Sequence, residues 1–67
     1  MIDWSKVTNN LRRRMSLAKV ARQIGADPKT LQRLARGEIN EPRFSVGVLL
    51  LGVHKDVCPE RHHEIRS

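Results

Sequence analysis

Long polar side chains recur at helical spacing between residues 28 and 36 and could hydrogen-bond to a nucleic acid. At about 100° per residue, a helix over this stretch would separate polar from apolar groups on opposite faces. The polar face would hold Lys29, Gln32, Arg33 and Arg36, and the apolar face Leu31, Leu34 and Ala35. Arginine and lysine bind guanine edges in the DNA major groove, and glutamine binds adenine edges. This acid-free face predicts contact with duplex DNA. The alternative is a solvated charged surface, which usually mixes signs.

Two short helices joined by a tight turn are expected to position this face. Residues 17–24 place apolar side chains at the i, i+3, i+4 and i+7 positions of one helical stripe, and Ser16 before them suits an N-cap. Gly25 then suits a helix end, Asp27 an N-cap and Pro28 a first helical position. One helix therefore ends and another begins within about four residues, which is helix-turn-helix geometry.

The rest of the chain is also expected to be helical. A first helix is predicted from Asp3, since the apolar residues that follow it share one face, namely Trp4, Val7 and Leu11. Gly37 is expected to end the 28–36 helix, and a loop should follow over 38–42. The apolar stretch 44–55 has no second strand to pair with, so a helix is favoured there. We therefore predict an all-α fold, a compact bundle of four to five helices around a central helix-turn-helix.

The segment 44–53 is apolar on nearly all sides of the expected helix. Such a helix either lies at the centre of the core or leaves an exposed patch that packs against a second copy of the chain. We therefore expect a homodimer, with 44–53 as its candidate interface.

Positive charge is concentrated in the predicted helix-turn-helix. The 67-residue chain has a formal net charge of +6, and residues 12–36 hold eight of its 13 lysines and arginines but one of its seven acids. This distribution indicates a polyanionic partner. Trp4 and Phe44 are the only aromatic residues, so the stacking platform that many single-strand and RNA binders use is missing. Double-stranded DNA is the expected partner.

Phosphate contacts are expected from polar residues near those predicted to contact bases. The candidates are Ser16, Lys19, Arg22, Arg36, Arg12, Arg13 and Arg14. The arginine run at 12–14 follows the first predicted helix, where cations also oppose the negative end of the helix dipole. A solvated, dipole-stabilising cluster is therefore the alternative for these three residues.

Enzymatic and membrane functions find no support in the sequence. No paired carboxylates and no nucleophile and base occur in a catalytic arrangement, so we expect no enzyme, no cofactor and no small-molecule substrate. The single cysteine, Cys58, cannot form an intramolecular disulfide. The first residues lack the apolar core of a signal peptide, and the longest apolar run is too short to span a membrane. We expect a cytoplasmic protein.

The C-terminal part contains potential metal ligands, namely His54, Cys58, His62 and His63. Pro59 interrupts helical spacing among them, and no second ligand pair of fixed spacing precedes them, so no metal site is predicted. The residues beyond Pro59 are mostly polar. We expect a DNA-binding domain at 1–58 and a polar, flexible tail at 59–67.

The segment SLAKVARQIGADPKTLQRLARGEINEPR resembles the helix-turn-helix of the lambda-repressor-like family, which includes phage Cro proteins and repressors. The matching features are a small residue four positions before the turn glycine, apolar positions between the helices, a closing glycine and a later proline. The small residue is Ala21 and the turn glycine is Gly25. The apolar positions are Val20, Ile24, Leu31 and Leu34, the closing glycine is Gly37 and the later proline is Pro42. The resemblance implies a helical bundle that binds operator DNA as a symmetric dimer, with residues 28–36 in the major groove.

By position, the resemblance implies that bases are faced by Pro28, Lys29, Gln32 and Arg33. The start of the first motif helix, near Leu17 and Ala18, would approach the DNA backbone. Many family members have Gln or Thr at this start, so here Ser16 or a backbone N–H would contact the phosphate.

The resemblance implies a transcriptional regulator of the Cro or repressor type, in a bacterium or a phage-infected cell. One alternative is a helix-turn-helix module in a non-transcriptional role, such as an excisionase, a packaging protein or an antitoxin. Another is a protein-interaction module that uses the apolar segment 44–53.

Overall fold

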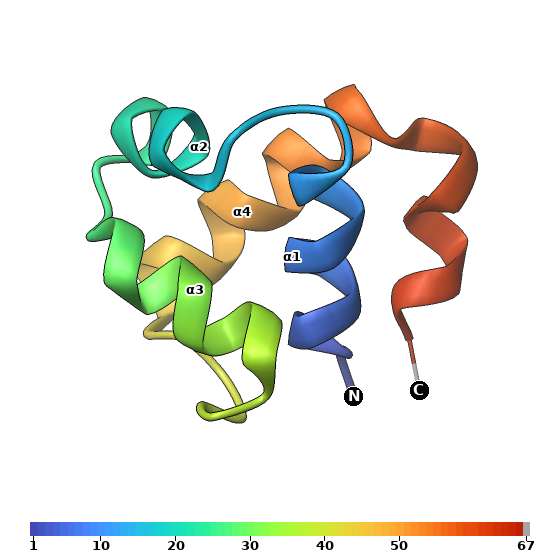
Figure 1. Ribbon diagram of the computed structural model, residues 1–67. Helices are drawn as coiled ribbons and strands as arrows, with labels where there is room; N and C mark the ends of the chain where they lie inside the picture. Colours follow the sequence, from blue (N-terminus) through green and yellow to red (C-terminus); the bar gives the residue numbers. More distant parts are fainter. Residues whose placement is uncertain (67) are drawn as a thin grey trace.

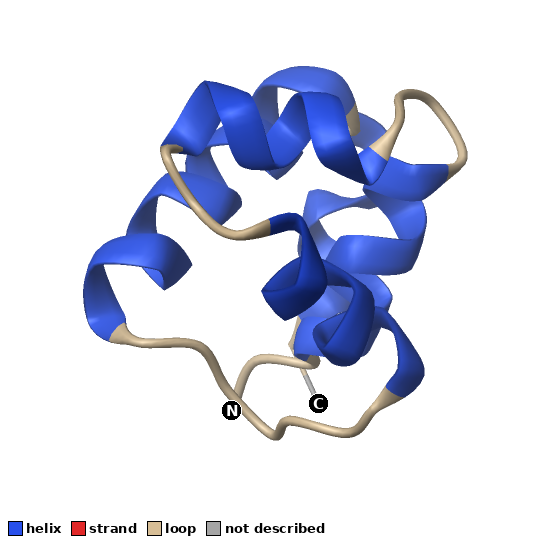
Figure 2. Ribbon diagram, turned by 60° about the vertical axis from the view of Figure 1, so that its left-hand side comes forward, coloured by secondary structure: helices blue, strands red, loops and turns tan. Residues whose placement is uncertain are grey.

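The computed structural model describes residues 1–66, which form five helices joined by short connections (Figure 1). They are α1 (Trp4–Arg12), α2 (Leu17–Ile24), α3 (Pro28–Arg36), α4 (Phe44–Val57) and the 3₁₀ helix η1 (Pro59–Ile65). Figure 2 shows that helices and loops make up the whole described part. Strand-like pairing among these residues is limited to one bridge between Ile2 and Arg66. The predicted all-α helical bundle is confirmed.

Residues at the helix ends explain where the first three helices begin and stop. The N-cap side chains are Asp3 for α1, Ser16 for α2 and Asp27 for α3, and each accepts a hydrogen bond of 2.9–3.1 Å from a first-turn backbone N–H. These bonds satisfy amides that a helix start leaves without a partner. Gly25 and Gly37 end α2 and α3 with φ of 73° and 78°, a left-handed conformation that glycine adopts without strain.

The helix α1 is the element around which the others pack. It contacts α2, α3, α4 and η1, and its Val7 and Leu11 are fully buried. The remaining helices add apolar side chains to the same core, namely Leu17, Val20, Ala21, Ile24, Leu31, Leu34, Leu50, Val53, Cys58 and Ile65. In Figure 1, α1 lies between α3 and η1. The packing on α1 therefore fixes how α2 and α3 are presented to solvent.

The helix α4 buries only one of its sides. It is helical as predicted, and its Leu50 and Val53 belong to the core. Three large apolar side chains on it are exposed: Phe44 at 86%, Val48 at 51% and Leu49 at 49%. The sequence left two alternatives for the segment 44–53, a place in the core or an exposed patch. Both occur, on different faces of α4. At 14 residues α4 is still short, and no helix within residues 1–66 is long and apolar enough to cross a bilayer.

The C-terminal segment differs from the flexible tail expected at 59–67. The helix η1 packs on α1 and α4, and Ile65 is only 2% exposed. The N–H of Asp3 also donates to the carbonyl of Ile65 at 2.6 Å. The sequence prediction missed this packing because the segment contains a single apolar anchor among polar residues. No domain boundary follows residue 58 in the described part, and residue 67 of the expected tail lies outside it.

Candidate nucleic-acid interface

The helices α2 and α3 form the pair that the sequence predicts (Figure 1). The turn between them is closed by the N–H of Ala26, which donates to the carbonyl of Ala21 at 2.9 Å. Ala21 is fully buried, and α2 and α3 pack directly on each other. A small side chain at this point lets two helices cross closely. The short turn and this packing hold α3 at a fixed angle to α2.

The helix α3 separates apolar and polar residues onto opposite faces. Leu31 and Leu34 are fully buried. The residues predicted to contact bases are all exposed, namely Pro28, Lys29, Gln32 and Arg33. No salt bridge or side-chain hydrogen bond within residues 1–66 engages the last three of these. We name these four residues the recognition face, and its polar groups are available to a ligand.

Asn9 of α1 holds the carboxyl end of α3. Its Nδ2 donates to the carbonyl oxygens of Ala35 at 2.9 Å and of Ser5 at 2.8 Å. The Ala35 carbonyl belongs to the last turn of α3, where no intrahelical donor follows. Asn9 therefore ties the recognition face to the core. Sequence reasoning missed it, because 26 residues separate the two partners and a single polar residue in α1 does not indicate what it contacts.

An open hollow lies beside the recognition face, where the end of α1, the start of α2 and α3 meet. It is lined by Arg12, Ser16, Leu17, Ala18, Gln32, Ala35 and Arg36. The first N–H groups of α2 have no intrahelical acceptors, and a helix N-terminus attracts anions. The Ser16 Oγ accepts from the N–H of Lys19 at 3.1 Å, so its hydroxyl proton can still donate. Two guanidinium groups and a helix N-terminus together suit a phosphate.

Four other predicted phosphate contacts are exposed, namely Arg13, Lys19, Arg22 and Arg36. Arg13, Lys19 and Arg22 form no salt bridge within residues 1–66. Arg36 does form one: its Nε lies 2.7 Å from Oε2 of Glu38, and both side chains are more than half exposed. An acid therefore engages one of the two arginines of the hollow. Sequence reasoning did not identify Glu38 as part of the site.

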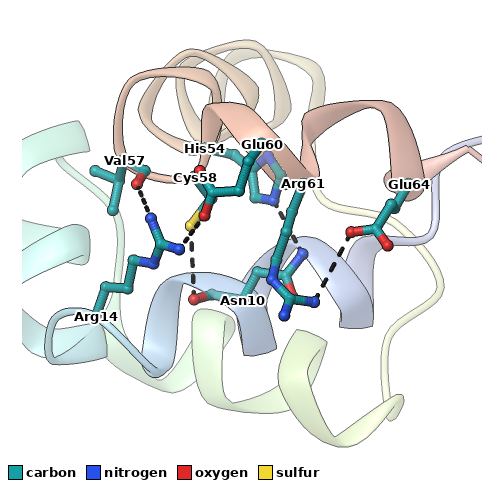
Figure 3. Close-up of polar contacts among 8 residues, drawn as sticks. All are labelled: Asn10, Arg14, His54, Val57, Cys58, Glu60, Arg61 and Glu64. Atoms are coloured by element: carbon teal, nitrogen blue, oxygen red, sulfur yellow. Dashed lines mark hydrogen bonds and ion pairs between the residues drawn. The ribbon is translucent and has the colours of Figure 1, made fainter.

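Arg14 is set apart from the other predicted phosphate contacts. Its guanidinium donates to the carbonyl of Val57 at 2.7 Å and forms an ion pair with Glu60 (Figure 3). Both contacts connect the end of α1 to α4 and η1. Arg14 therefore does not line the hollow with Arg12, although the two residues are close in sequence.

His54, Asn10 and His62 form a polar chain, buried at Asn10 and His54 and half-buried at His62, that the sequence did not predict. Asn10 Nδ2 donates to His54 Nε2 at 3.1 Å, and His54 Nδ1 lies 3.0 Å from Nδ1 of His62. Because an amide nitrogen only donates, neutral His54 carries its proton on Nδ1 and donates it to His62. Burial lowers the pKa of His54; His62 lowers it further, and Glu60 opposes both. In Figure 3 a dashed line joins Asn10 to His54, and Glu60 points toward Arg14.

Of the four residues considered as metal ligands in the sequence, His54 and His62 lie together, but no third ligand joins them within residues 1–66. His54 and Cys58 are fully buried, whereas His63 is exposed. No group of three or more His, Cys, Asp or Glu side chains in residues 1–66 is arranged to hold a metal ion. The Cys58 thiol donates to the Asn10 carbonyl at 3.7 Å, and burial raises its pKa. Cys58 thus contributes packing and a weak hydrogen bond between α4 and α1.

The resemblance to the lambda-repressor-like family rests on the sequence pattern described above. The fold agrees with that resemblance as far as an all-α bundle with adjacent α2 and α3 helices. Comparison of the chain with protein-family models, with curated proteins and with solved structures finds no match.

Proposed function

We propose that this chain binds duplex DNA sequence-specifically and regulates transcription, with α3 inserted in the major groove. The proposal rests on the recognition face. Lys29, Gln32 and Arg33 are exposed on one side of α3, with no acid among them and no partner within residues 1–66. A helix face that only interacts with water usually mixes signs and pairs its charges.

The recognition face matches the chemistry of base edges. Arg33 and Lys29 would bind guanine O6 and N7, and Gln32 would bind adenine. Pro28 has no N–H to donate, so its ring would offer an apolar contact, as to a thymine methyl group. An α-helix with its side chains is about 10–12 Å across, which suits a major groove about 12 Å wide, and the nine residues of α3 would extend about 14 Å within it.

Phosphate contacts would set the position of α3 in the groove. The hollow beside the recognition face supplies Arg12, Ser16 and Arg36. Lys19 and Arg22 extend the cationic surface along α2. Such contacts provide affinity and register without reading the sequence. Arg14 is left out of this role because Glu60 neutralises it.

The size of the chain favours two copies on one operator. Its longest extent is 25 Å, which covers about seven base pairs at about 3.4 Å per base pair. A second copy related by two-fold symmetry would double the length of sequence that is read. The half-site centres would then lie about 34 Å apart, or a multiple of that.

Selection of bound sites from random duplex DNA tests this proposal. We expect the chain to enrich a palindromic consensus. The variant Lys29→Ala/Gln32→Ala/Arg33→Ala should enrich no site. The control Lys6→Ala/Lys55→Ala should enrich the same consensus as the original chain, because both lysines are exposed and lie outside the hollow and the recognition face. Circular dichroism checks that all variants remain helical.

Failure of the original chain to enrich any site would overturn the proposed regulator. Binding to DNA that does not weaken with salt would also count against it, because phosphate contacts make affinity salt-dependent. Either result would favour a protein-interaction module that uses the apolar segment 44–53.

A further inference from the structure

Phe44 projects from the start of α4 beside an apolar groove. Its side chain is 86% exposed. The groove next to it is lined by Trp4, Glu41, Pro42, Phe44, Gly47, Val48 and Leu51. These residues are apart from the hollow at α2 and from the recognition face. One patch of surface thus carries both a protruding aromatic ring and an apolar depression.

Gly47 lets Trp4 and Pro42 pack close to the α4 backbone at the edge of this groove. A Cβ atom at Gly47 would lie 3.0 Å from Cη2 of Trp4 and 3.4 Å from Cγ of Pro42. The Trp4 ring therefore packs directly on the α4 backbone. The ring forms one wall of the groove, and Val48 and Leu51 lie on the α4 side.

The patch carries little charge in a strongly basic chain, and Glu41 is the one charged residue among those that line the groove. No charged residue occurs from Phe44 to His54, and the two nearest charges before it, Glu41 and Arg43, have opposite signs. A nucleic acid would find no cation among the residues that line this groove, and a basic peptide would find a single acid. Two copies of a chain with net charge +6 repel each other, and they do so least across a surface that carries little positive charge.

We propose that a second copy of this chain docks on this patch by a two-fold exchange, in which Phe44 of each copy fills the groove of the other. A two-fold interface uses the same surface on both partners, so that surface must hold both the protrusion and its receptor. Phe44 and the adjoining groove meet this requirement. The exchange would cover the exposed ring of Phe44 and the half-exposed Val48, which both line the groove.

The exposed area indicates a weak, reversible dimer. A phenylalanine side chain buries about 150–250 Å² when fully covered, so Phe44 at 86% exposure offers about 170 Å². With Val48 only half exposed, the patch falls below the roughly 1,200–2,000 Å² that stable interfaces bury in total. We expect a dissociation constant on the order of 0.1–1 mM without DNA. A DNA with two adjacent half-sites would strengthen the association by holding both copies together.

Trp4 is the only tryptophan of the chain and reports on the groove directly. Sedimentation equilibrium and Trp4 emission would be measured without DNA, from about one tenth of the expected dissociation constant to about ten times it. We expect the chain to dimerise over this range and its emission to shift to the blue as the partner's Phe44 excludes water. Phe44→Ser should stay monomeric with unshifted emission. Asp56→Ser, an exposed α4 control outside the groove, should behave like the original chain.

Two results would overturn the exchange. One is an original chain that stays monomeric over the whole range, and the other is a Phe44→Ser variant that dimerises as well as the original. Phe44 is too exposed to be needed for folding, and circular dichroism would verify this. Site selection tests DNA binding separately: a monomer that selects a site contradicts only the exchange, and a dimer that selects none contradicts only the proposed function.

Discussion

Replacing Glu38 by glutamine is expected to strengthen DNA binding. The Glu38 carboxylate lies 2.7 Å from Nε of Arg36, one of the two arginines that line the hollow. In the free protein the Glu38 carboxylate is paired with the Arg36 guanidinium, which we propose binds a DNA phosphate. DNA must therefore displace Glu38 before Arg36 can bind, and the acid also repels the incoming phosphate. Glu38→Gln removes both effects.

The size of the effect follows from the exposure of the pair. The two side chains are 62% and 51% exposed, and ion pairs of this kind contribute about 0.2–1 kcal/mol. Releasing Arg36 should therefore tighten binding about 1.4- to 5-fold. If Arg36 then neutralises one phosphate more fully, the slope of log K against log salt should steepen by up to about 0.9. Removing any one acid also increases the general attraction of the protein to DNA. Glu41→Gln is the control for this effect, because Glu41 forms no salt bridge within residues 1–66.

Fluorescence anisotropy with a random-sequence duplex at several salt concentrations measures both quantities. Glu38→Gln should bind more tightly than Glu41→Gln, and the difference should disappear when both changes are made in an Arg36→Ala background. Equal affinities for the two glutamine variants would refute the reasoning. So would a Glu38→Gln gain that survives without Arg36.

Two further predictions concern stability. Gly47→Ala places a Cβ 3.0 Å from Trp4, and overpacking of about 1–3 kcal/mol should exceed the gain of about 1 kcal/mol in helix propensity. A Cβ at residue 52 would meet open space, so Gly52→Ala should stabilise the protein by about 0.5–1 kcal/mol. The urea midpoint should therefore fall for Gly47→Ala and rise for Gly52→Ala, and shifts in the same direction would contradict the packing of Trp4 on Gly47. The free energy of unfolding should fall as the pH drops from 6.5 through the lowered folded-state pKa of His54, because the unfolded chain, with the ordinary value of 6.5, binds the proton first. The exposed control His63→Gln should keep this dependence, and urea midpoints that do not change between about pH 7.5 and about pH 5 would exclude it.

The helices could be predicted from the sequence because their signals are local. Asp27 and Pro28 start α3 and Gly37 ends it within a few residues of where each signal stands. The two faces of α3 follow from helical spacing alone, and the structure buries Leu31 and Leu34 and exposes the recognition face as that spacing predicts. This local information was enough to predict the fold class and the exposure of the residues expected to contact bases.

Contacts between distant parts of the chain could not be predicted in the same way. Arg14 and Glu60 are 46 residues apart, and Asn10 and His54 are 44 apart. Nothing in the arginine run 12–14 indicates that one member turns toward η1 while Arg12 lines the hollow. The position of η1 depends on these contacts and on the burial of Ile65, so composition alone suggested a tail.

Recognition of DNA by α3 is tested most directly by comparing Arg33→Ala on a selected site and on random duplex DNA. Arg33 is exposed and has no ion-pair partner within residues 1–66, so its removal should leave the fold unchanged. Arg22→Ala, the phosphate-contact control on α2, should weaken binding to both DNAs alike. We predict that Arg33→Ala loses about 1–3 kcal/mol on the selected site, relaxes selectivity at one base pair and loses less on random DNA. Equal losses on the two DNAs would contradict base recognition by α3.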